Sequence, residues 1–284
     1  MTFEHMEIKE VPEERAERFI LEYHYMKYLP QLNDFFLGGY VDGELAAVMS
    51  LGWGVRPRHT IQKLFPSLDT GDYRAIGRLC AVEEMPKNTE SHFIGKCIKH
   101  LKREYDFDVL FTWADGMLGK PGTIYQATNF WYAGHIWTDT YLTKDGEKVH
   151  PRQTNRIGGR PSWSEMQDLE WQHYRGMQLR YIYFLCDSER QETLLENAEV
   201  EMQQGDYPKK AALQWKQRTA EGWVKCGKPD FNPEALTYNS DHQENYQAQQ
   251  EQQELGTFVH GQRMSHYTPS ESEERFSLNT RGDE

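Results

Sequence analysis

A strand–helix–strand unit at residues 73–113 constrains the fold of this chain more than any other feature. Tyr73–Val82 has the composition of a strand, and Asp108–Trp113 is typical of a buried one. Between them the sequence predicts an amphipathic helix, capped by Asn88 or Thr89. Its apolar stripe consists of Phe93, Ile94, Cys97, Ile98 and Leu101. A crossover helix joins parallel strands, so we expect these two strands to be parallel and in one sheet.

Further elements are predicted on both sides of this unit. A helix over 12–26 begins after Pro12. A hairpin follows, in which strands 34–41 and 44–51 are joined by Asp42-Gly43, a pair that suits a tight turn. The remaining elements are a short helix over 122–130 and strands over 131–142 and 180–186. Together they predict an α/β (α+β) fold, with a mixed twisted sheet and flanking helices.

Charge is distributed unevenly along the 284 residues. The chain has 32 Lys+Arg and 44 Asp+Glu, a net charge of −12, which ordinarily argues against a nucleic-acid partner. Residues 191–284 alone hold 9 Lys+Arg and 17 Asp+Glu, however. We therefore predict a folded domain over 1–205, a C-terminal extension over 206–236 and an acidic, Gln-rich disordered tail over 237–284.

Several classes of protein are disfavoured by simple patterns. No run approaches the roughly 18 apolar residues of a membrane span, and the N-terminus lacks a secretory signal. The four cysteines show neither a CxxC pair nor zinc-type spacing, which favours reduced thiols in a cytosolic protein. They are Cys80, Cys97, Cys186 and Cys226.

The first candidate for chemistry is Asp115, which follows the strand that ends at Trp113. Ligands collect at the carboxyl ends of parallel strands, and a carboxylate there can act as a general base. Gly116, Gly119 and Gly122 would let a substrate approach the backbone. The alternative is that Asp115 and the glycines only form a turn and a helix start.

Arg78 and the triplet Tyr23-His24-Tyr25 are further candidates. A guanidinium among apolar strand residues needs a carboxylate or an anionic ligand, unless it lies on an exposed face. The triplet can supply a general base, a metal ligand or a stacking surface, and the alternative for His24 is a core histidine. No local metal-binding motif and no GxSxG elbow are present.

A basic loop over 144–160 is the best candidate for contact with nucleic acid, although a plain solvated loop is an equal alternative. It carries five Lys or Arg residues against Asp145 and Glu147, and aromatic residues precede it. With two arginines from an earlier loop, the predicted DNA-binding set is Arg56, Arg58, Lys148, Arg152, Arg156 and Arg160.

The order of these motifs resembles the Mom family of bacteriophage DNA-modification proteins over about residues 8–205. The motifs are Tyr23-His24-Tyr25, the Asp42-Gly43 turn, GRLC around Arg78, PKNTES, WADG around Asp115, GTIYQATNFWYAG around Tyr125, and RYIYFL. The resemblance implies a fold like that of the GCN5-related N-acetyltransferases (GNAT-like). It also implies a transferase that places a carbamoylmethyl group on the exocyclic amino group of adenine and so protects viral DNA from restriction.

The resemblance carries site residues with it. The implied catalytic residues are His24, Tyr25, Arg78, Asp115 and Tyr125. Iron is implied through the His-Tyr region, although no metal cage is visible in the sequence. The donor is expected to be of an acyl or glycyl type. PKNTES replaces the glycine-rich turn that cradles coenzyme A in typical members, which argues against acetyl-CoA. Lys87, Asn88 and Ser91 from PKNTES are the predicted donor-binding residues.

The expected partner is double-stranded DNA, with no membrane, in the host cytoplasm, and a homodimer is the expected assembly. Two other functions stay open. One is an acyl-CoA-dependent N-acyltransferase of a small amine or protein, which the missing glycine turn disfavours. The other is a phage protein that binds DNA or inhibits a host factor without catalysis.

Overall fold

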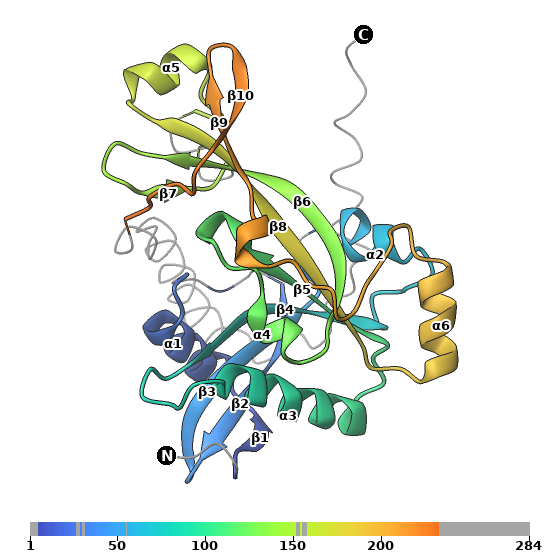
Figure 1. The fold of residues 1–284 in the computed structure, drawn as a ribbon. Coiled ribbons are helices and arrows are strands. Elements are labelled where there is room, and N and C mark those ends of the chain that lie inside the picture. Colours follow the sequence, from blue (N-terminus) through green and yellow to red (C-terminus); the bar gives the residue numbers. More distant parts are fainter. Residues whose placement is uncertain are drawn as a thin grey trace, which may run out of the picture. The chain divides into compact units, whose positions relative to one another are not determined.

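A computed structural model describes residues 5–26, 29, 32–54, 56–151, 154 and 158–232 (Figure 1). These residues belong to one compact unit that spans residues 1–238. The tail predicted over 237–284 lies outside the described residues, as do Arg152 and Arg156. Within the described part, no helix is long and apolar enough to cross a membrane.

One mixed sheet forms the centre of this unit, in the order β1-β2-β3-β4-β5-β8-β6-β7, with β9 paired to β8 and β10 to β9. The strands are β1 (Glu7–Glu10), β2 (Asn33–Val41), β3 (Glu44–Gly52), β4 (Tyr73–Ala81), β5 (Val109–Asp115), β6 (Trp131–Leu142), β7 (Lys148–Val149), β8 (Gln172–Phe184), β9 (Trp215–Thr219) and β10 (Gly222–Cys226). The helices are α1 (Glu13–Tyr23), α2 (Ile61–Leu64), α3 (Thr89–Glu104), α4 (Thr123–Gln126), α5 (Trp163–Asp168) and α6 (Ser188–Glu196). Short 3-10 turns are η1 (Pro57–His59), η2 (Gly116–Leu118) and η4 (Lys210–Ala212). The mixed α/β fold class is confirmed.

The predicted crossover is also confirmed, because β4 and β5 are parallel and α3 joins them. Their pairing is short. It covers Tyr73–Ala75 with Val109–Phe111 and then stops, although both strands continue. At the point of divergence the hydroxyl of Thr112 donates to the carbonyl oxygen of Ile76 at 3.3 Å. A side chain of β5 thus contacts the backbone of β4 where the pairing of the two strands has ended.

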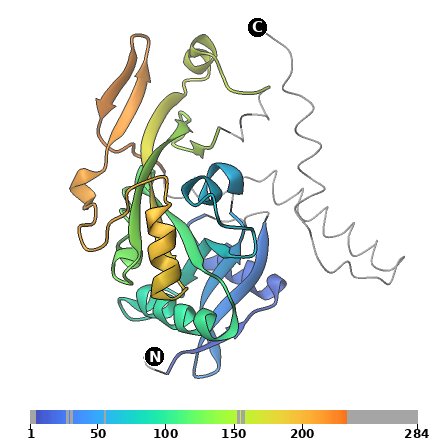
Figure 2. The same ribbon diagram turned by 90° about the vertical axis from the view of Figure 1, so that its right-hand side faces the viewer.

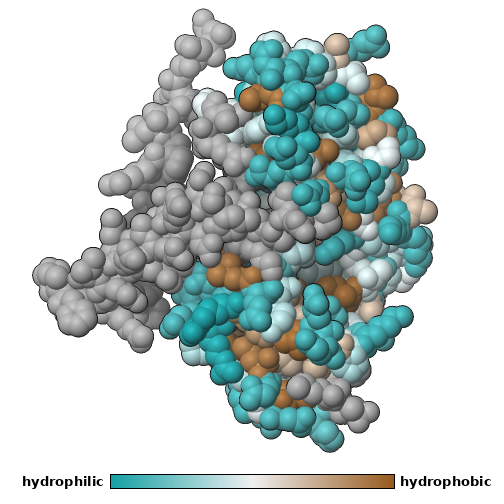
Figure 3. All heavy atoms as spheres, turned by 90° about the vertical axis from the view of Figure 1, so that its left-hand side faces the viewer, coloured by the Kyte–Doolittle hydropathy of each residue, from teal (hydrophilic) through white to brown (hydrophobic). Residues whose placement is uncertain are grey.

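Helices cover both faces of the sheet (Figures 1 and 2). The apolar stripe of α3 packs in one core cluster with Met49, whereas α1 packs with Val48. Neighbouring strand residues point to opposite faces, so α1 and α3 lie on opposite sides of the sheet. Likewise α2 packs with Phe111 and α3 with Leu110. On the face in Figure 3, the described surface is mainly hydrophilic, with small separate apolar patches.

Predictions of local structure were confirmed where the sequence pattern was strong. In the β2–β3 hairpin, Asp42 and Gly43 have φ values of 52° and 86°, as the turn requires. The predicted side-chain cap of α3 was wrong. Asn88 lies in the left-handed region and makes no capping hydrogen bond, and the hydroxyl of Thr89 donates to the carbonyl oxygen of Pro86 at 2.7 Å.

Several boundaries also differ from the prediction. The helix expected over 12–26 ends at Tyr23, the helix expected over 122–130 ends at Gln126, and β5 continues two residues further, to Asp115. The strand expected over 180–186 begins at Gln172. The first half of β8 contains several polar side chains and Gly176, so its composition did not indicate a strand. β6 and β8 therefore form a long two-stranded arm that extends beyond β5.

We expect Gly116→Ala to lower the free energy of unfolding by about 1–3 kcal/mol, the usual cost of an overpacked core position. A Cβ atom at Gly116 would collide with the backbone carbonyl oxygen of Met177 and lie 2.9 Å from Leu179 Cδ1, so η2 would have to move away from β8. Chemical denaturation measures the loss.

Gly95→Ala is the matched control, because a Cβ atom there meets nothing within 4 Å inside α3. This substitution should raise the free energy of unfolding by about 0.5–1 kcal/mol, since alanine is the better helix former. Equal effects of the two substitutions would contradict the proposed contact between η2 and β8.

Candidate functional site

The site is built where β4 and β5 diverge, and a bulge in β4 sets its first residue. Opposite β3, Ser50 pairs with Arg78 and Leu51 with Ile76, so Gly77 is an extra residue in β4. Such a bulge redirects the side chains that follow it. The hydroxyl of the fully buried Ser50 accepts from the Arg78 amide at 2.8 Å, and Arg78 Nη1 donates to the Gly77 carbonyl at 2.7 Å.

Arg78 meets Tyr125 in this region. Tyr125 comes from α4, is buried, and packs in the same core cluster as Ala114 of β5. Burial raises the pKa of the Tyr125 hydroxyl, and a hydrogen bond with Thr112 and the positive charge of Arg78 oppose that rise. The hydroxyl is therefore neutral at neutral pH, and it donates to the Thr112 hydroxyl, which itself donates to Ile76, while the guanidinium of Arg78 lies close to it.

A second group of side chains surrounds Asp115 at the end of β5. Lys148 of β7 forms an ion pair with it, with Nζ 2.9 Å from Oδ2, and the two side chains are only 17% and 16% exposed. The other carboxylate oxygen, Oδ1, accepts from the amide of Leu118 at 3.4 Å and so caps η2. Both oxygens are thus oriented by neighbours, which fixes the carboxylate in place.

Lys120 connects Asp115 to the residues that follow α1. Its ammonium lies 3.5 Å from the centre of the Tyr25 ring, and it interacts electrostatically with Asp115, Lys148 and Glu90. Although part of its side chain is exposed, the surrounding protein lowers the pKa of Lys120, and Asp115 partly offsets this effect. A lysine with a lowered pKa exchanges protons more readily near neutral pH than an ordinary one.

His24 is buried at the end of α1 and has a local structural contact. Its Nδ1 lies 2.9 Å from the amide nitrogen and 3.1 Å from the carbonyl oxygen of Met26, so it is hydrogen-bonded to the backbone of Met26 in either tautomer. The ring also stacks on Tyr25, with centroids 4.4 Å apart. This backbone contact favours the core reading of His24, since one ring nitrogen is already engaged.

The structure therefore places the predicted catalytic residues in two groups along the diverging strands. Tyr25 and Asp115 are joined through Lys120, and His24 stacks on Tyr25. Arg78 and Tyr125 form the second group. Thr112, which is hydrogen-bonded to Tyr125, and Asp115 are three residues apart on β5, about 10 Å along the strand, and their side chains point to opposite faces of it.

The predicted DNA-binding and donor-binding residues have different positions. Lys148, expected on a flexible loop, is instead the ion-pair partner of Asp115. Arg56 and Arg58 are exposed near η1, and Arg160 is exposed and interacts electrostatically with Tyr141. The donor-binding residues lie at the start of α3. Lys87 and Asn88 are exposed there, and the hydroxyl of Ser91 donates to the Asn88 carbonyl at 3.0 Å.

Neither iron nor a coenzyme A pyrophosphate is matched by the residues that are described. No three His, Cys, Asp or Glu side chains among them are grouped so that they could bind a metal ion. The start of α3 has no glycine, and Glu83, Glu84 and Glu90 outnumber Lys87 there. An acidic helix start repels a pyrophosphate.

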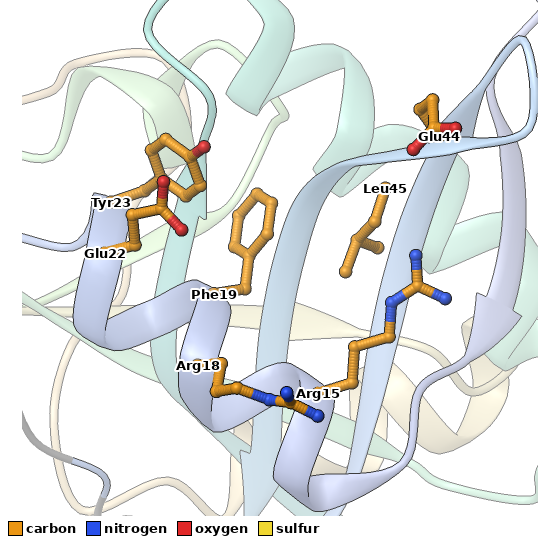
Figure 4. Close-up of a pocket in the computed structure, with 7 residues that line it drawn as sticks. All are labelled: Arg15, Arg18, Phe19, Glu22, Tyr23, Glu44 and Leu45. Carbon is orange, nitrogen blue, oxygen red and sulfur yellow. The ribbon is translucent and has the colours of Figure 1, made fainter.

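A shallow surface pocket of about 230 Å³ lies between α1 and the start of β3 (Figure 4). It is lined by Arg15, Arg18, Phe19, Glu22, Tyr23, Glu44 and Leu45. Two of its polar side chains already have partners. Arg18 forms an ion pair with Glu14 at 3.0 Å, and Tyr23 is hydrogen-bonded to Glu22. None of the predicted catalytic residues lines this pocket.

Lys120 is the site residue that sequence reasoning missed. It lies in the text GMLGKPG, between glycine and proline, where a lysine looks like an ordinary loop residue. The only available signal was its position five residues after Asp115, in the loop that follows a parallel strand.

The model of the Mom protein family matches residues 5–209. The chain is 26% identical over 174 residues to "Methylcarbamoylase mom" of Escherichia phage Mu, a match that covers 60% of this chain and 71% of that protein.

The chain also has low similarity to several solved structures of acetyltransferases. An N-acetyltransferase from Staphylococcus aureus Mu50 is 13% identical, with a TM-score of 0.35, over 64% of this chain and 99% of that one. Arabidopsis thaliana NAA60 in complex with acetyl-CoA is 11% identical, with a TM-score of 0.39, over 63% of this chain and 98% of that one. The fold class is established by the mixed sheet itself and does not depend on these similarities.

A double-mutant cycle on Asp115→Asn and Lys148→Met tests the ion pair. Each single substitution leaves a mostly buried charge without its partner, so each should cost about 1–3 kcal/mol of stability, with a coupling free energy of about 1 kcal/mol or more. Chemical denaturation of the four proteins gives these values. The exposed Lys9–Glu7 pair is the control and should show no measurable coupling. Additive effects at Asp115 and Lys148 would contradict the pairing.

Proposed function

We propose, since this chain belongs to the Mom protein family, that it is a transferase that places a carbamoylmethyl (methylcarbamoyl) group on the exocyclic amino nitrogen of adenine in double-stranded DNA. The observation that carries this proposal is the oriented, mostly buried Asp115–Lys148 pair, with Lys120 beside it, at the carboxyl end of β5. A site of this kind supplies a fixed base and a nearby proton donor.

The proposed reaction needs both groups. The adenine amino nitrogen is a weak nucleophile, because its lone pair is delocalised into the ring. A bond from this nitrogen to the donor carbon forms while the bond from that carbon to the leaving group breaks, and the nitrogen loses one proton. Catalysis must therefore orient the amino group and accept the proton. An activated acyl- or glycyl-type compound is the proposed donor.

Asp115 is a better candidate than His24 for the base. Both oxygens of Asp115 are oriented by neighbours but keep lone pairs for a further proton donor, whereas Nδ1 of the buried His24 is hydrogen-bonded to the backbone of Met26. Lys120, whose pKa is lowered, is the proposed proton donor to the leaving group. Tyr25, under the Lys120 ammonium, offers a ring face for the adenine.

Arg78 and Tyr125 are proposed to bind an anionic or carbonyl oxygen of the donor. The guanidinium is fixed by its own strand, through the contacts with Ser50 and Gly77, and the neutral hydroxyl of Tyr125 is close to it. Fixed donors of this kind stabilise negative charge that develops during a transfer reaction.

Modification of this nitrogen would protect DNA from restriction, because restriction enzymes read the adenine amino group as a donor in the major groove. A bulky substituent there obstructs the contact. The proposed setting is the host cytoplasm, where phage DNA and restriction enzymes meet, and a homodimer remains the proposed assembly.

The direct test is to express the protein in bacteria, digest their DNA to nucleosides and search for a modified deoxyadenosine by mass spectrometry. We expect a product that carries the added carbamoylmethyl mass. Asp115→Ala should abolish it, since the base is removed, and Asp145→Ala, at an exposed loop position, should leave it unchanged. Unmodified nucleosides from abundant folded wild-type protein would refute the proposal.

Arg78→Lys tests the role of the guanidinium. Lysine keeps the charge but lacks the planar fork of donors, so we expect at least about a tenfold loss of modification rate. The backbone bond between Arg78 and Ser50 is retained, so the melting temperature should change little. A variant with a normal melting temperature and a wild-type rate would show that the guanidinium binds nothing in the reaction.

A further inference from the structure

A basic hairpin lies in the sequence just after the part that matches the Mom family. The match ends at residue 209, and β9 and β10 follow it. Residues 207–228 contain six Lys or Arg residues and one Glu, within a chain whose net charge is −12. This concentration of positive charge is therefore opposite in sign to the chain as a whole.

The hairpin is attached to the arm formed by β6 and β8 (Figure 1). Lys216 of β9 pairs with Arg175 of β8, and Arg218 of β9 pairs with Trp223 of β10. Residues opposite each other in antiparallel strands lie on the same face, as do residues two apart along one strand. One face of the arm and hairpin thus combines Arg175, Lys216, Arg218 and Trp223.

Aromatic rings hold these cations in place. The guanidinium of Arg175 lies 4.2 Å from the ring centre of Trp223, and that of Arg218 lies 6.0 Å from it. The ammonium of Lys216 lies 4.4 Å from the ring centre of Trp137, which is 37% exposed. Cation–aromatic contacts restrict these long side chains, and Arg175, Lys216 and Arg218 are all half-buried.

Little negative charge opposes them. Asp139 contacts Arg175 at 2.6 Å and His173 at 3.5 Å. Burial would raise the pKa of Asp139, but the neighbouring His173 and the hydrogen bond from Arg175 lower it to about 2, so this carboxylate is charged at neutral pH. It offsets one positive charge. Among the described residues, Lys216 and Arg218 form no ion pair, so their charges remain available.

We propose that this face, made by the β9–β10 hairpin with Arg175 and Trp137, binds the phosphate backbone of duplex DNA without regard to sequence. Charge complementarity identifies the occupant, because phosphates are the dense, regular anions that such a row of cations neutralises. The proposal rests on the proposed function, to which it adds a docking surface. Gln178 of β8 pairs with Asp115, and Arg175 lies three residues away on the same strand, so its side chain points to the opposite face of the sheet from Asp115.

The test compares the double variant Lys216→Gln/Arg218→Gln with the wild type. Binding to a labelled duplex is measured by fluorescence anisotropy between 50 and 200 mM salt (about the range over which counterion release is resolved). Each lost phosphate contact should reduce the slope of log K against log salt by about 0.9, so we expect a reduction of about 2 and a clear loss of affinity. A duplex of unrelated sequence should give the same result.

The matched control is Lys99→Gln/Arg103→Gln, which removes the same charge from exposed positions on α3. It should leave the slope and the affinity close to wild type. If the hairpin variant does not fold, Arg218→Gln/Lys225→Gln replaces it, since Lys225 is exposed and pairs with Lys216. Equal losses in the control and hairpin variants, or no loss in either, would overturn the proposal.

The binding assay separates this inference from the proposed function, because it requires no catalysis. Weaker DNA binding by the hairpin variant, together with unmodified nucleosides from wild-type cells, would support the docking surface and refute the transferase. If the hairpin variant bound DNA like the wild type and modified nucleosides were present, the docking surface would be refuted and the transferase supported.

Discussion

The divergence of β4 and β5 is the constraint on which the site depends. Two parallel strands that stayed paired to their ends would leave no room for side chains between them. Here the pairing stops after Ala75, and Thr112 uses its hydroxyl to satisfy the carbonyl of Ile76. The bulge at Gly77 directs Arg78, and Tyr125 from α4 meets it. Polar groups are thus collected inside an otherwise apolar sheet, at a point where each has a hydrogen-bond partner.

Opposite charges then organise the end of β5. Asp115 alone, mostly buried, would carry a large desolvation cost, and Lys148 offsets it from β7, a strand at the far edge of the sheet. The ion pair therefore links the carboxyl end of β5 to the arm. Lys120 adds a second positive charge beside Lys148, and burial together with that repulsion keeps its pKa low, against the opposing effect of Asp115. One arrangement thus supplies both a fixed carboxylate and, in the proposed reaction, a proton donor.

The sequence predicted the crossover and the β2–β3 hairpin because both follow from local patterns, an apolar stripe on α3 and the Asp42-Gly43 turn. It also indicated Asp115 by its place after a strand. It could not indicate Lys148 as the partner, since 33 residues separate the two and only the sheet order brings them together. The strands of the β9–β10 hairpin were missed because they are short, half-exposed and rich in cations.

The net charge of the chain, finally, says little about how it meets DNA. Charges more than about 10 Å apart are largely screened at 0.1 M salt, so a phosphate close to the surface responds to the residues nearest to it. Near the arm these are Arg175, Lys216 and Arg218. Most of the net charge of the chain comes from Asp and Glu residues elsewhere in 191–284. An acidic protein can thus bind a polyanion, provided that its cations are concentrated and held by rigid aromatic neighbours.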